Sequence, residues 1–303
     1  MTEWRVSLNI NEILLRDPYI LEKDNTYYLY GSRVGAIAGK PGFDYQDGLE
    51  VYKSKDLITW SKGKSLFGDK GFFEKKCELW APEIYCYKGK YYMFVTIKRY
   101  NDSKNKCRGT YVFTCDTPDG EFKLHSENAI TPAEWECLDG HLYIENDKPY
   151  MIFCHEWEQA TDGEFCVIEM DEELKHSVGN AKVLFSASSA DWVVSKGNNV
   201  YVSDGPFMFR EDGILYMLWS SFTDKGYAIG LSYSESGSVM GEWKHCSKPI
   251  FDKDGGHAML FNTVDNIRKI IFHTPNASLK SSPKIEDFVK CGKRNYSMLG
   301  ESN

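Results

Sequence analysis

The stretch Asp17-Pro-Tyr-Ile-Leu-Glu-Lys-Asp-Asn-Thr-Tyr-Tyr-Leu-Tyr30 consists of an apolar segment, a polar turn and an aromatic segment. The turn residues Asp24 and Asn25 tolerate the left-handed backbone that a two-residue β-hairpin requires. The aromatic and aliphatic side chains on both sides of the turn suit the pleated, half-buried surface of a sheet. The stretch therefore predicts a β-hairpin.

This layout occurs five times along the chain. The copies start at residues 17, 81, 139, 204 and 256, so that successive starts lie 64, 58, 65 and 52 residues apart. A second pair of strands follows each copy, as in residues 51–60 and 230–243. Four short strands in a repeat this long are typical of a propeller blade rather than a solenoid.

We therefore predict a single all-β domain over residues 1–303, a five-bladed β-propeller with four antiparallel strands per blade. No segment has the 3.6-residue apolar period of a long helix. Residues 4–8 are expected to close the ring by pairing with the last blade, which would remove exposed strand edges.

The composition fits this fold and narrows the partners. Of the 303 residues, 42% are hydrophobic and 15% aromatic, and 36 basic against 44 acidic side chains give a formal charge of −8. This balance argues against nucleic acid or an anionic membrane as a partner. The start of the sequence shows no signal peptide, and the nine cysteines form no C-x-x-C pair or zinc-ligand spacing. These features predict reduced thiols in a cytoplasmic protein.

The innermost strands of a propeller begin around one central axis. The predicted register brings Asp17, Asp139 and Asp204 to one mouth of that axis. An Asp-Pro or Asp-Gly turn explains any one of them, but three at repeat positions indicate a site. Two carboxyl groups cleave a glycosidic bond when the ionised one deprotonates water and the protonated one donates to the leaving oxygen. A third carboxylate raises the pKa of the acid by repulsion.

Short motifs in all five copies resemble glycoside hydrolase family 43. In order along the chain they are Arg16-Asp17-Pro18, Trp80-Ala81-Pro82-Glu83, Leu138-Asp139-Gly140-His141-Leu142, Asp204-Gly205-Pro206 and Gly255-Gly256-His257. The resemblance implies an inverting five-bladed propeller that acts mainly on α-L-arabinofuranosides, β-D-xylosides or β-1,3-galactans. It also implies that Asp17 is the general base and that Asp139 tunes and orients the acid.

The fourth copy departs from the pattern of that family. Asp204 precedes Gly-Pro where the family usually has Glu, so its carboxyl group reaches less far toward the substrate. We assign Asp204 as the general acid. The alternatives are a recruited acid, Glu83 or Glu156, or a propeller that binds sugar without cleaving it.

Further residues are expected around the pocket. Trp80 is placed to stack on the apolar face of a sugar ring, and Glu83, Glu156 and Trp157 are predicted substrate contacts. His257 lies where the family often has a histidine beside a central calcium. Calcium prefers oxygen ligands, so such an ion would be structural or electrostatic, and a hydrogen-bonded core histidine is the other interpretation. No organic cofactor is expected.

The leading hypothesis is an exo-acting, inverting hydrolase that releases terminal α-L-arabinofuranose from arabinoxylan- or arabinan-derived oligosaccharides. These partners are neutral fragments of the plant cell wall. A β-xylosidase is the alternative within the family, because the two sugars present similar hydroxyl layouts. A catalytically silent carbohydrate-binding propeller is the alternative outside it. Endo-arabinanase activity is disfavoured without a secretion signal, and the sequence leaves the oligomeric state open.

Overall fold

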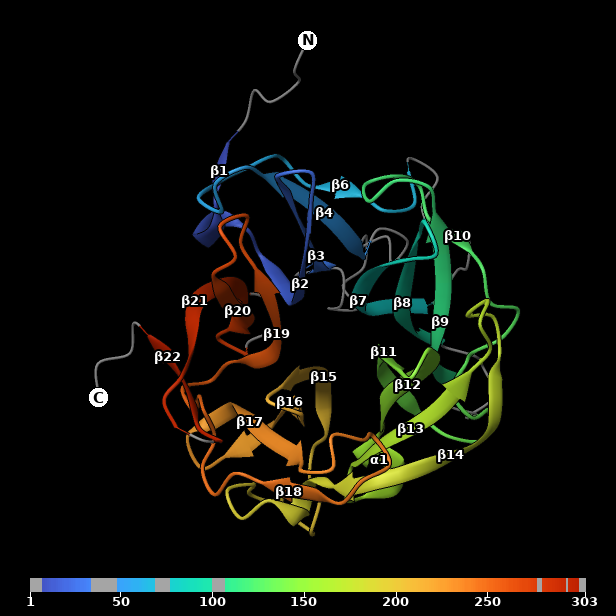
Figure 1. Cartoon of the computed structure of the whole chain (residues 1–303), viewed down its shortest axis with the longest axis vertical. Coiled ribbons are helices and arrows are strands. Elements are labelled where there is room, and N and C mark those ends of the chain that lie inside the picture. The colour runs from blue at the N-terminus through green and yellow to red at the C-terminus, as the bar shows by residue number, and fades with distance from the viewer. Residues whose placement is uncertain are drawn as a thin grey trace.

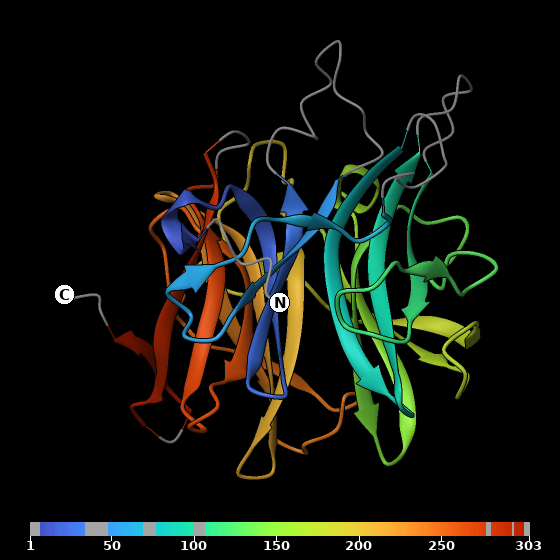
Figure 2. The same cartoon turned by 90° about the horizontal axis from the view of Figure 1, so that it is seen from above.

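The computed structural model describes residues 7–33, 48–68, 77–99, 107–276, 280–292 and 294–299. Five antiparallel β-sheets stand around a central axis (Figure 1), and their strands run roughly along that axis (Figure 2). The prediction of an all-β, five-bladed propeller is confirmed. The α-helix of the described residues is the single turn α1 (Trp157–Ala160), and no helix among them is long and apolar enough to cross a membrane.

Each blade is built from consecutive strands. Blade I contains β1 (Leu8–Asn9), β2 (Leu15–Lys23), β3 (Thr26–Arg33), β4 (Leu49–Ser54), β5 (Thr59–Trp60) and β6 (Lys64–Ser65). Blade II contains β7 (Cys77–Tyr87), β8 (Lys90–Arg99), β9 (Cys107–Cys115) and β10 (Lys123–Leu124). Blade III contains β11 (Cys137–Glu145), β12 (Lys148–His155), β13 (Glu164–Met170) and β14 (Ser177–Ser186). Blade IV contains β15 (Asp204–Glu211), β16 (Ile214–Thr223), β17 (Gly226–Ser234) and β18 (Trp243–His245). Blade V contains β19 (Gly256–Asn262), β20 (Arg268–Thr274), β21 (Ser282–Lys290) and β22 (Tyr296–Leu299).

The aromatic side chains of the repeat fill the space between blades. Trp219 of β16 is fully buried, and its ring centroid lies 5.0 Å from that of Phe165 in blade III. Tyr19 of β2 meets Tyr85 of β7 edge to face at 5.7 Å. Such ring pairs stabilise the fold beyond the burial of their apolar area, so most of the aromatic side chains serve to pack the blades together.

Every innermost strand has an irregularity at the same place. The pairing of β2 with β3 shifts register between Arg16 and Tyr19, and the four other innermost strands shift at the equivalent position. One residue in each shift has a left-handed backbone, with φ between 49° and 57°: Asp17, Ala81, Asp139, Gly205 and His257. A bulge of this kind bends its strand and re-aims its side chains.

This geometry corrects the register predicted for the fourth copy. The left-handed residue there is Gly205, so Asp204 is equivalent to Arg16 rather than to Asp17. A Cβ atom on Gly205 would lie 2.9 Å from Cγ of His257, which is too close for any side chain. Both this contact and the left-handed backbone therefore require glycine at position 205. Asp204 therefore reaches the axis from one residue earlier in its strand.

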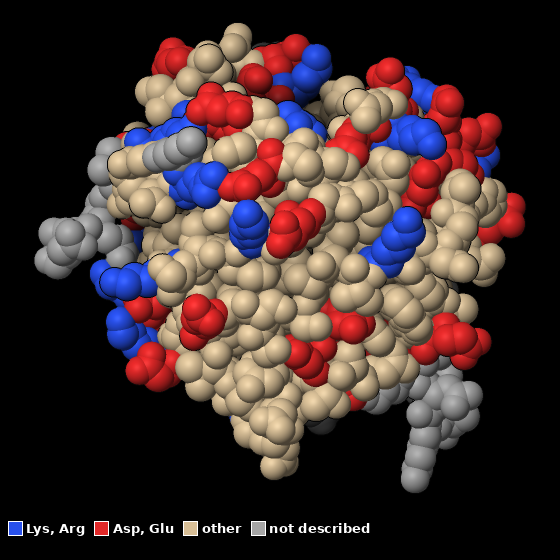
Figure 3. Space-filling model, turned by 60° about the horizontal axis from the view of Figure 1, so that its bottom comes forward, with Lys and Arg blue, Asp and Glu red and all other residues tan. Residues whose placement is uncertain are grey.

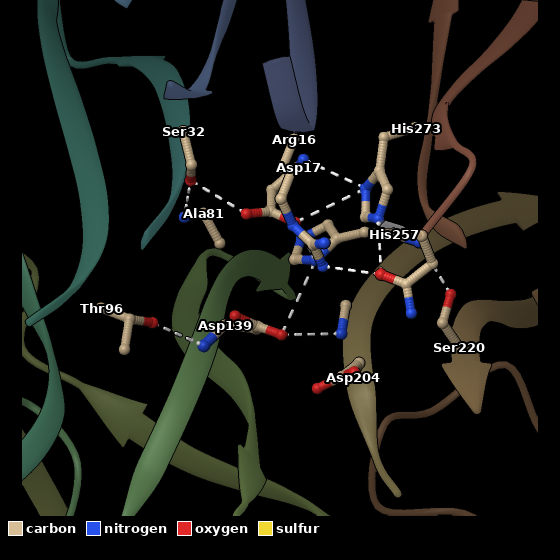
Figure 4. A network of polar contacts seen from close by, with 12 residues as sticks. Arg16, Asp17, Ser32, Ala81, Thr96, Asp139, Asp204, Ser220, His257 and His273 are labelled. Carbon is tan, nitrogen blue, oxygen red and sulfur yellow. Dashed lines mark hydrogen bonds and ion pairs between the residues drawn. The ribbon is translucent and has the colours of Figure 1, made fainter. Parts of the chain in front are cut away.

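A ring of hydrogen bonds joins the blades around the axis (Figure 4). The backbone N–H of each left-handed residue donates to a side chain of the preceding blade: Ala81 to Ser32, Asp139 to Thr96, Gly205 to Asp139, His257 to Ser220 and Asp17 to His273, over 2.8–3.2 Å. We call these five bonds the axial ring. Because a buried N–H without an acceptor costs about 1–3 kcal/mol, the axial ring holds the bulges of the five innermost strands in place around the axis.

The predicted closure of the propeller by pairing of residues 4–8 with the last blade is not seen for Leu8. Leu8 of β1 pairs with Trp60 of β5, inside blade I, and residues 4–6 lie outside the described part of the chain. Blade V is complete from its own four strands. Blades V and I meet instead through the N–H of Leu15, which donates to the carbonyl of Ser281 at 3.0 Å, and through the axial ring.

Two neighbouring serines of β16 provide a test of the axial ring. Both are fully buried, but Ser220 Oγ accepts the N–H of His257, whereas Ser221 Oγ has no hydrogen-bond partner among the described residues. We expect S220A to lower the free energy of unfolding by about 1–3 kcal/mol, because it strands a buried donor. S221A should be neutral or stabilising. Equilibrium urea unfolding measures both, and equal losses in the two variants would refute the assignment.

Candidate active site

A cavity of about 320 Å³ opens on the axis where the innermost strands begin. All five blades contribute to its lining: Arg16, Asp17, Trp80, Leu138, Asp139, Glu156, Asp204, Tyr227 and His257. The three predicted carboxylates therefore meet in one cavity, together with Trp80, Glu156 and His257. Figure 4 shows the side chains of Asp17, Asp139 and His257 pointing toward one another from different strands, with Asp204 beside them.

Asp17 is held as an anion. Ser32 Oγ donates to its Oδ2 at 2.9 Å, and Nδ1 of His257 lies 3.4 Å from its Oδ1. Burial raises the pKa of the Asp17 carboxyl, but His257, the Arg16 guanidinium and the hydrogen bond from Ser32 outweigh burial and hold that pKa below its ordinary value. Asp17 is therefore ionised near neutral pH, as a general base must be.

A buried histidine supports Asp17 from behind. His273 Nδ1 accepts the N–H of Asp17, and His273 Nε2 faces Oδ1 of Asn276 at 3.4 Å. Arg16 Nη2 donates to the same Asn276 oxygen at 2.8 Å. Burial lowers the pKa of His273 to about 3, so its ring is neutral near pH 7 and Nδ1 can act as the acceptor.

Asp204 has the opposite environment. Burial and then the carboxylates of Asp139 and Glu156 raise its pKa well above the ordinary value, against a smaller lowering by His257. The hydroxyl of Tyr227 donates to Oδ2 of Asp204 at 3.0 Å, which leaves Oδ1 to carry a proton. A carboxyl group that keeps its proton at higher pH has the property of a general acid.

Asp139 lies between these two groups. Its Oδ2 accepts the N–H of Gly205 at 2.9 Å and is 3.8 Å from Nδ1 of His257. Burial and then the charge of Asp17 raise the pKa of Asp139 well above its ordinary value. Because both Asp139 and Asp204 have raised pKa values and repel each other, the pair retains a proton where an isolated aspartate is ionised.

One wall of the cavity combines an indole with a bound carboxylate. The guanidinium of Arg108 lies 5.1 Å from the centre of the Trp80 ring and forms ion pairs with Glu156 and, at 2.9 Å, with Glu158. Glu156 is 4% exposed, and burial raises its pKa although Arg108 opposes the rise. Trp80 and Glu156 therefore line the cavity, and the cations of Arg108 and Lys98 each lie 5.1 Å from the centre of the Trp80 ring.

Two other predicted contacts point elsewhere. Glu83 lies in a buried polar cluster, with Oε2 2.8 Å from Nδ1 of His141, and is not among the described residues that line the cavity. It follows the bulge by two residues, the position that holds Tyr19 and Phe207 in other blades, and that position faces the space between blades. Trp157 is also outside the lining and has Lys196 Nζ 5.7 Å from its ring.

The donor set does not match a protein-built calcium site. Calcium takes six to eight oxygen ligands, whereas the described residues contain no group of three or more His, Cys, Asp or Glu side chains that could hold a metal ion. Nδ1 of His257 faces Asp17 and Asp139. The calcium beside His257 stays a prediction that depends on water ligands, and no step of the reaction is assigned to it.

Sequence reasoning did not assign roles to three residues at this site. Arg16 was visible only as the neighbour of Asp17 in a motif. Tyr227 is the second residue of β17, just after a turn, and no pattern in the sequence connects it with Asp204. His273 lies 256 residues from Asp17, which it contacts only because the ring closes there.

The chain is similar to known glycoside hydrolases. Residues 10–294 match the family described as glycosyl hydrolases family 43. A structure titled as an endo-arabinase from Bacteroides thetaiotaomicron is 37% identical, with a TM-score of 0.80 over 95% of this chain and 99% of that one. An exo-α-(1→5)-L-arabinofuranosidase of Cellvibrio japonicus is 21% identical over 80% of this chain and 68% of its own length. An endo-α-(1→5)-L-arabinanase of Bacillus subtilis is 21% identical over 80% and 69%.

The neutral state of His273 predicts a pH dependence of stability. Between about pH 3 and 6.5 the unfolded chain binds a proton that the folded chain excludes, so stability falls as the pH is lowered through that window. Between pH 7 and pH 5, His273 lowers the free energy of unfolding by ~2 kcal/mol. H273Q keeps an oxygen acceptor without titrating. Urea unfolding at pH 7 and pH 5 should show a smaller loss in H273Q than in the native protein, and identical losses would exclude a buried neutral His273.

Proposed function

Because the chain belongs to glycosyl hydrolases family 43, we propose that it is an inverting hydrolase that releases terminal α-L-arabinofuranose from arabinan- or arabinoxylan-derived oligosaccharides. The observation that carries this proposal is the meeting of Asp17, Asp139 and Asp204 in one cavity, with a lowered pKa for Asp17 and raised pKa values for the other two. An ionised base and a protonated acid are the pair that glycosidic cleavage requires.

The proposed reaction is a single displacement. Asp17 takes a proton from a water molecule whose oxygen forms a bond to the anomeric carbon. The bond from that carbon to the glycosidic oxygen breaks, and Asp204 gives its proton to the leaving oxygen. Water attacks the face opposite the leaving group, so the configuration at the anomeric carbon inverts. Asp17 then loses its proton to solvent and Asp204 regains one.

The dimensions of the site support action at a chain end. The cavity of about 320 Å³ is at the small end of ligand pockets, which range over roughly 300–1,000 Å³. Its wall offers Trp80 for the apolar face of a sugar and Glu156 for the hydroxyl groups. The surface in Figure 3 intersperses acidic and basic side chains without one large patch of either sign, which suits a neutral oligosaccharide.

A second candidate is endo-cleavage of α-1,5-arabinan. It is favoured by the similarity of the chain to the structure titled as an endo-arabinase, at 37% identity. Within the family, β-xylosidase activity remains the alternative for the sugar itself. A short oligosaccharide substrate fits the predicted cytoplasmic location, which stays a prediction.

Product analysis on linear α-1,5-linked arabinopentaose distinguishes these activities. We expect arabinose and the tetrasaccharide as first products, because the cavity accommodates a chain end. Proton NMR in the first minutes should show arabinose with the anomeric configuration opposite to that of the substrate. Internal cleavage products would support the endo activity, hydrolysis of xylobiose alone the β-xylosidase, and a retained configuration would contradict the single displacement.

The assignment of the acid is tested with leaving groups of different quality. D204N should lower kcat on arabino-oligosaccharides by about 10²–10⁴-fold, since their leaving oxygen needs the proton. The loss should be much smaller on an aryl arabinofuranoside with a good leaving group. E156Q serves as the matched variant for the recruited acid. If E156Q rather than D204N shows this dependence on the leaving group, the acid is Glu156.

A further inference from the structure

The axial ring is almost the same in every blade, which makes its one exception informative. In four blades the acceptor comes from the second strand: Ser32, Thr96, Ser220 and His273. Each of these residues pairs across the sheet with the residue that precedes the left-handed position, as Ser32 does with Arg16. The place of the acceptor is therefore defined by the register.

Blade III has a cysteine at that place. Cys154 of β12 pairs with Leu138, the residue before the left-handed Asp139, and it is fully buried. A thiol is only a weak hydrogen-bond acceptor. The N–H of Gly205 in blade IV, which a hydroxyl at this place would accept, donates instead to Oδ2 of Asp139 at 2.9 Å.

Blade I shows what a hydroxyl at this place does. Asp17 has the same left-handed position as Asp139, but its blade carries Ser32 where blade III carries Cys154. Ser32 Oγ accepts the N–H of Ala81 at 2.9 Å and donates to Oδ2 of Asp17 at 2.9 Å. The Ser32 hydroxyl therefore lies between the Asp17 carboxylate and blade II, and it accepts the N–H of Ala81 in place of Asp17.

We propose that Cys154 is a positioning residue for the reaction, because its thiol leaves the N–H of Gly205 to Asp139. The hydrogen bond from the N–H of Gly205 holds the Asp139 carboxylate against the peptide that directly follows Asp204. It therefore fixes the carboxyl groups of Asp139 and Asp204 relative to each other. Serine at this position would rebuild the arrangement of blade I and withdraw Asp139 from that peptide. The inference rests on the proposed roles of the three aspartates.

The kinetic test compares a new hydroxyl with the mere loss of the thiol. C154S should lower kcat on arabino-oligosaccharides tenfold or more with little change in KM, because Asp139 acts on the acid and not on substrate binding. The decrease should be smaller on an aryl arabinofuranoside. C154A removes the thiol without supplying a hydrogen-bond acceptor, so its kcat should decrease much less than that of C154S.

Cys166 provides the matched control for a buried hydroxyl in the same blade. It lies on β13, fully buried, and belongs to the apolar cluster on the other face of blade III from Cys154. C166S should leave both kcat and the dependence on the leaving group as they are in the native protein. Thermal melting of all three variants establishes that each is folded under the assay conditions.

A crystal structure of C154S tests the same inference without activity. The introduced hydroxyl should lie about 3 Å from N of Gly205, with the Asp139 carboxylate released from that N–H. An intact bond between Asp139 and Gly205 would overturn the proposal, as would a kcat for C154S no lower than for C166S or C154A. If the native protein hydrolyses no glycoside, the proposed function fails, while the crystal structure still decides whether the hydroxyl exchanges the hydrogen bond.

Discussion

The left-handed residue at the start of each innermost strand, with its N–H bound by the preceding blade, is the constraint on which the site depends. It bends five strands at one level and points Asp17, Asp139 and His257 toward the axis from identical backbone positions. The same bonds join neighbouring blades, so the elements that hold the propeller together also place its carboxylates. Ser32 and Asp139 have both tasks, since each accepts an N–H of the next blade and takes part in the site.

Three residues of one chemical type have different properties because their surroundings differ. Asp139 is buried and Asp17 and Asp204 are partly buried, and burial by itself raises the pKa of a carboxyl group. At Asp17 the Arg16 guanidinium, His257 and the Ser32 hydroxyl outweigh that effect. At Asp204 the lowering by His257 and Tyr227 is smaller than the rise caused by burial and carboxylates, and Asp139 mainly faces carboxylates. The division into a base and an acid is thus a property of the blades that contact each residue.

The sequence predicts what local patterns determine and misses what arises between blades. The hairpins, the number of blades and the convergence of the aspartates follow from turn residues and a repeat, and they are confirmed. An alignment of the repeat on Asp-Gly hides the one-residue offset of Asp204, although Pro18, Pro82 and Pro206 each follow the left-handed residue. The direction of Glu83 depends on the bulge, and the contact of Tyr227 with Asp204 depends on packing, so neither leaves a local signal.

The axial cavity gives chemically identical carboxyl groups different pKa values. NMR titration of the native protein with ¹³C-labelled aspartate carboxyl carbons, assigned with D17N, D139N and D204N, measures this difference. The carboxyl carbon of Asp17 should titrate below the ordinary value of about 3.9, and at least one of Asp139 and Asp204 should titrate well above it. If all three titrate together near the ordinary value, the arrangement does not distinguish a base from an acid and the account is contradicted.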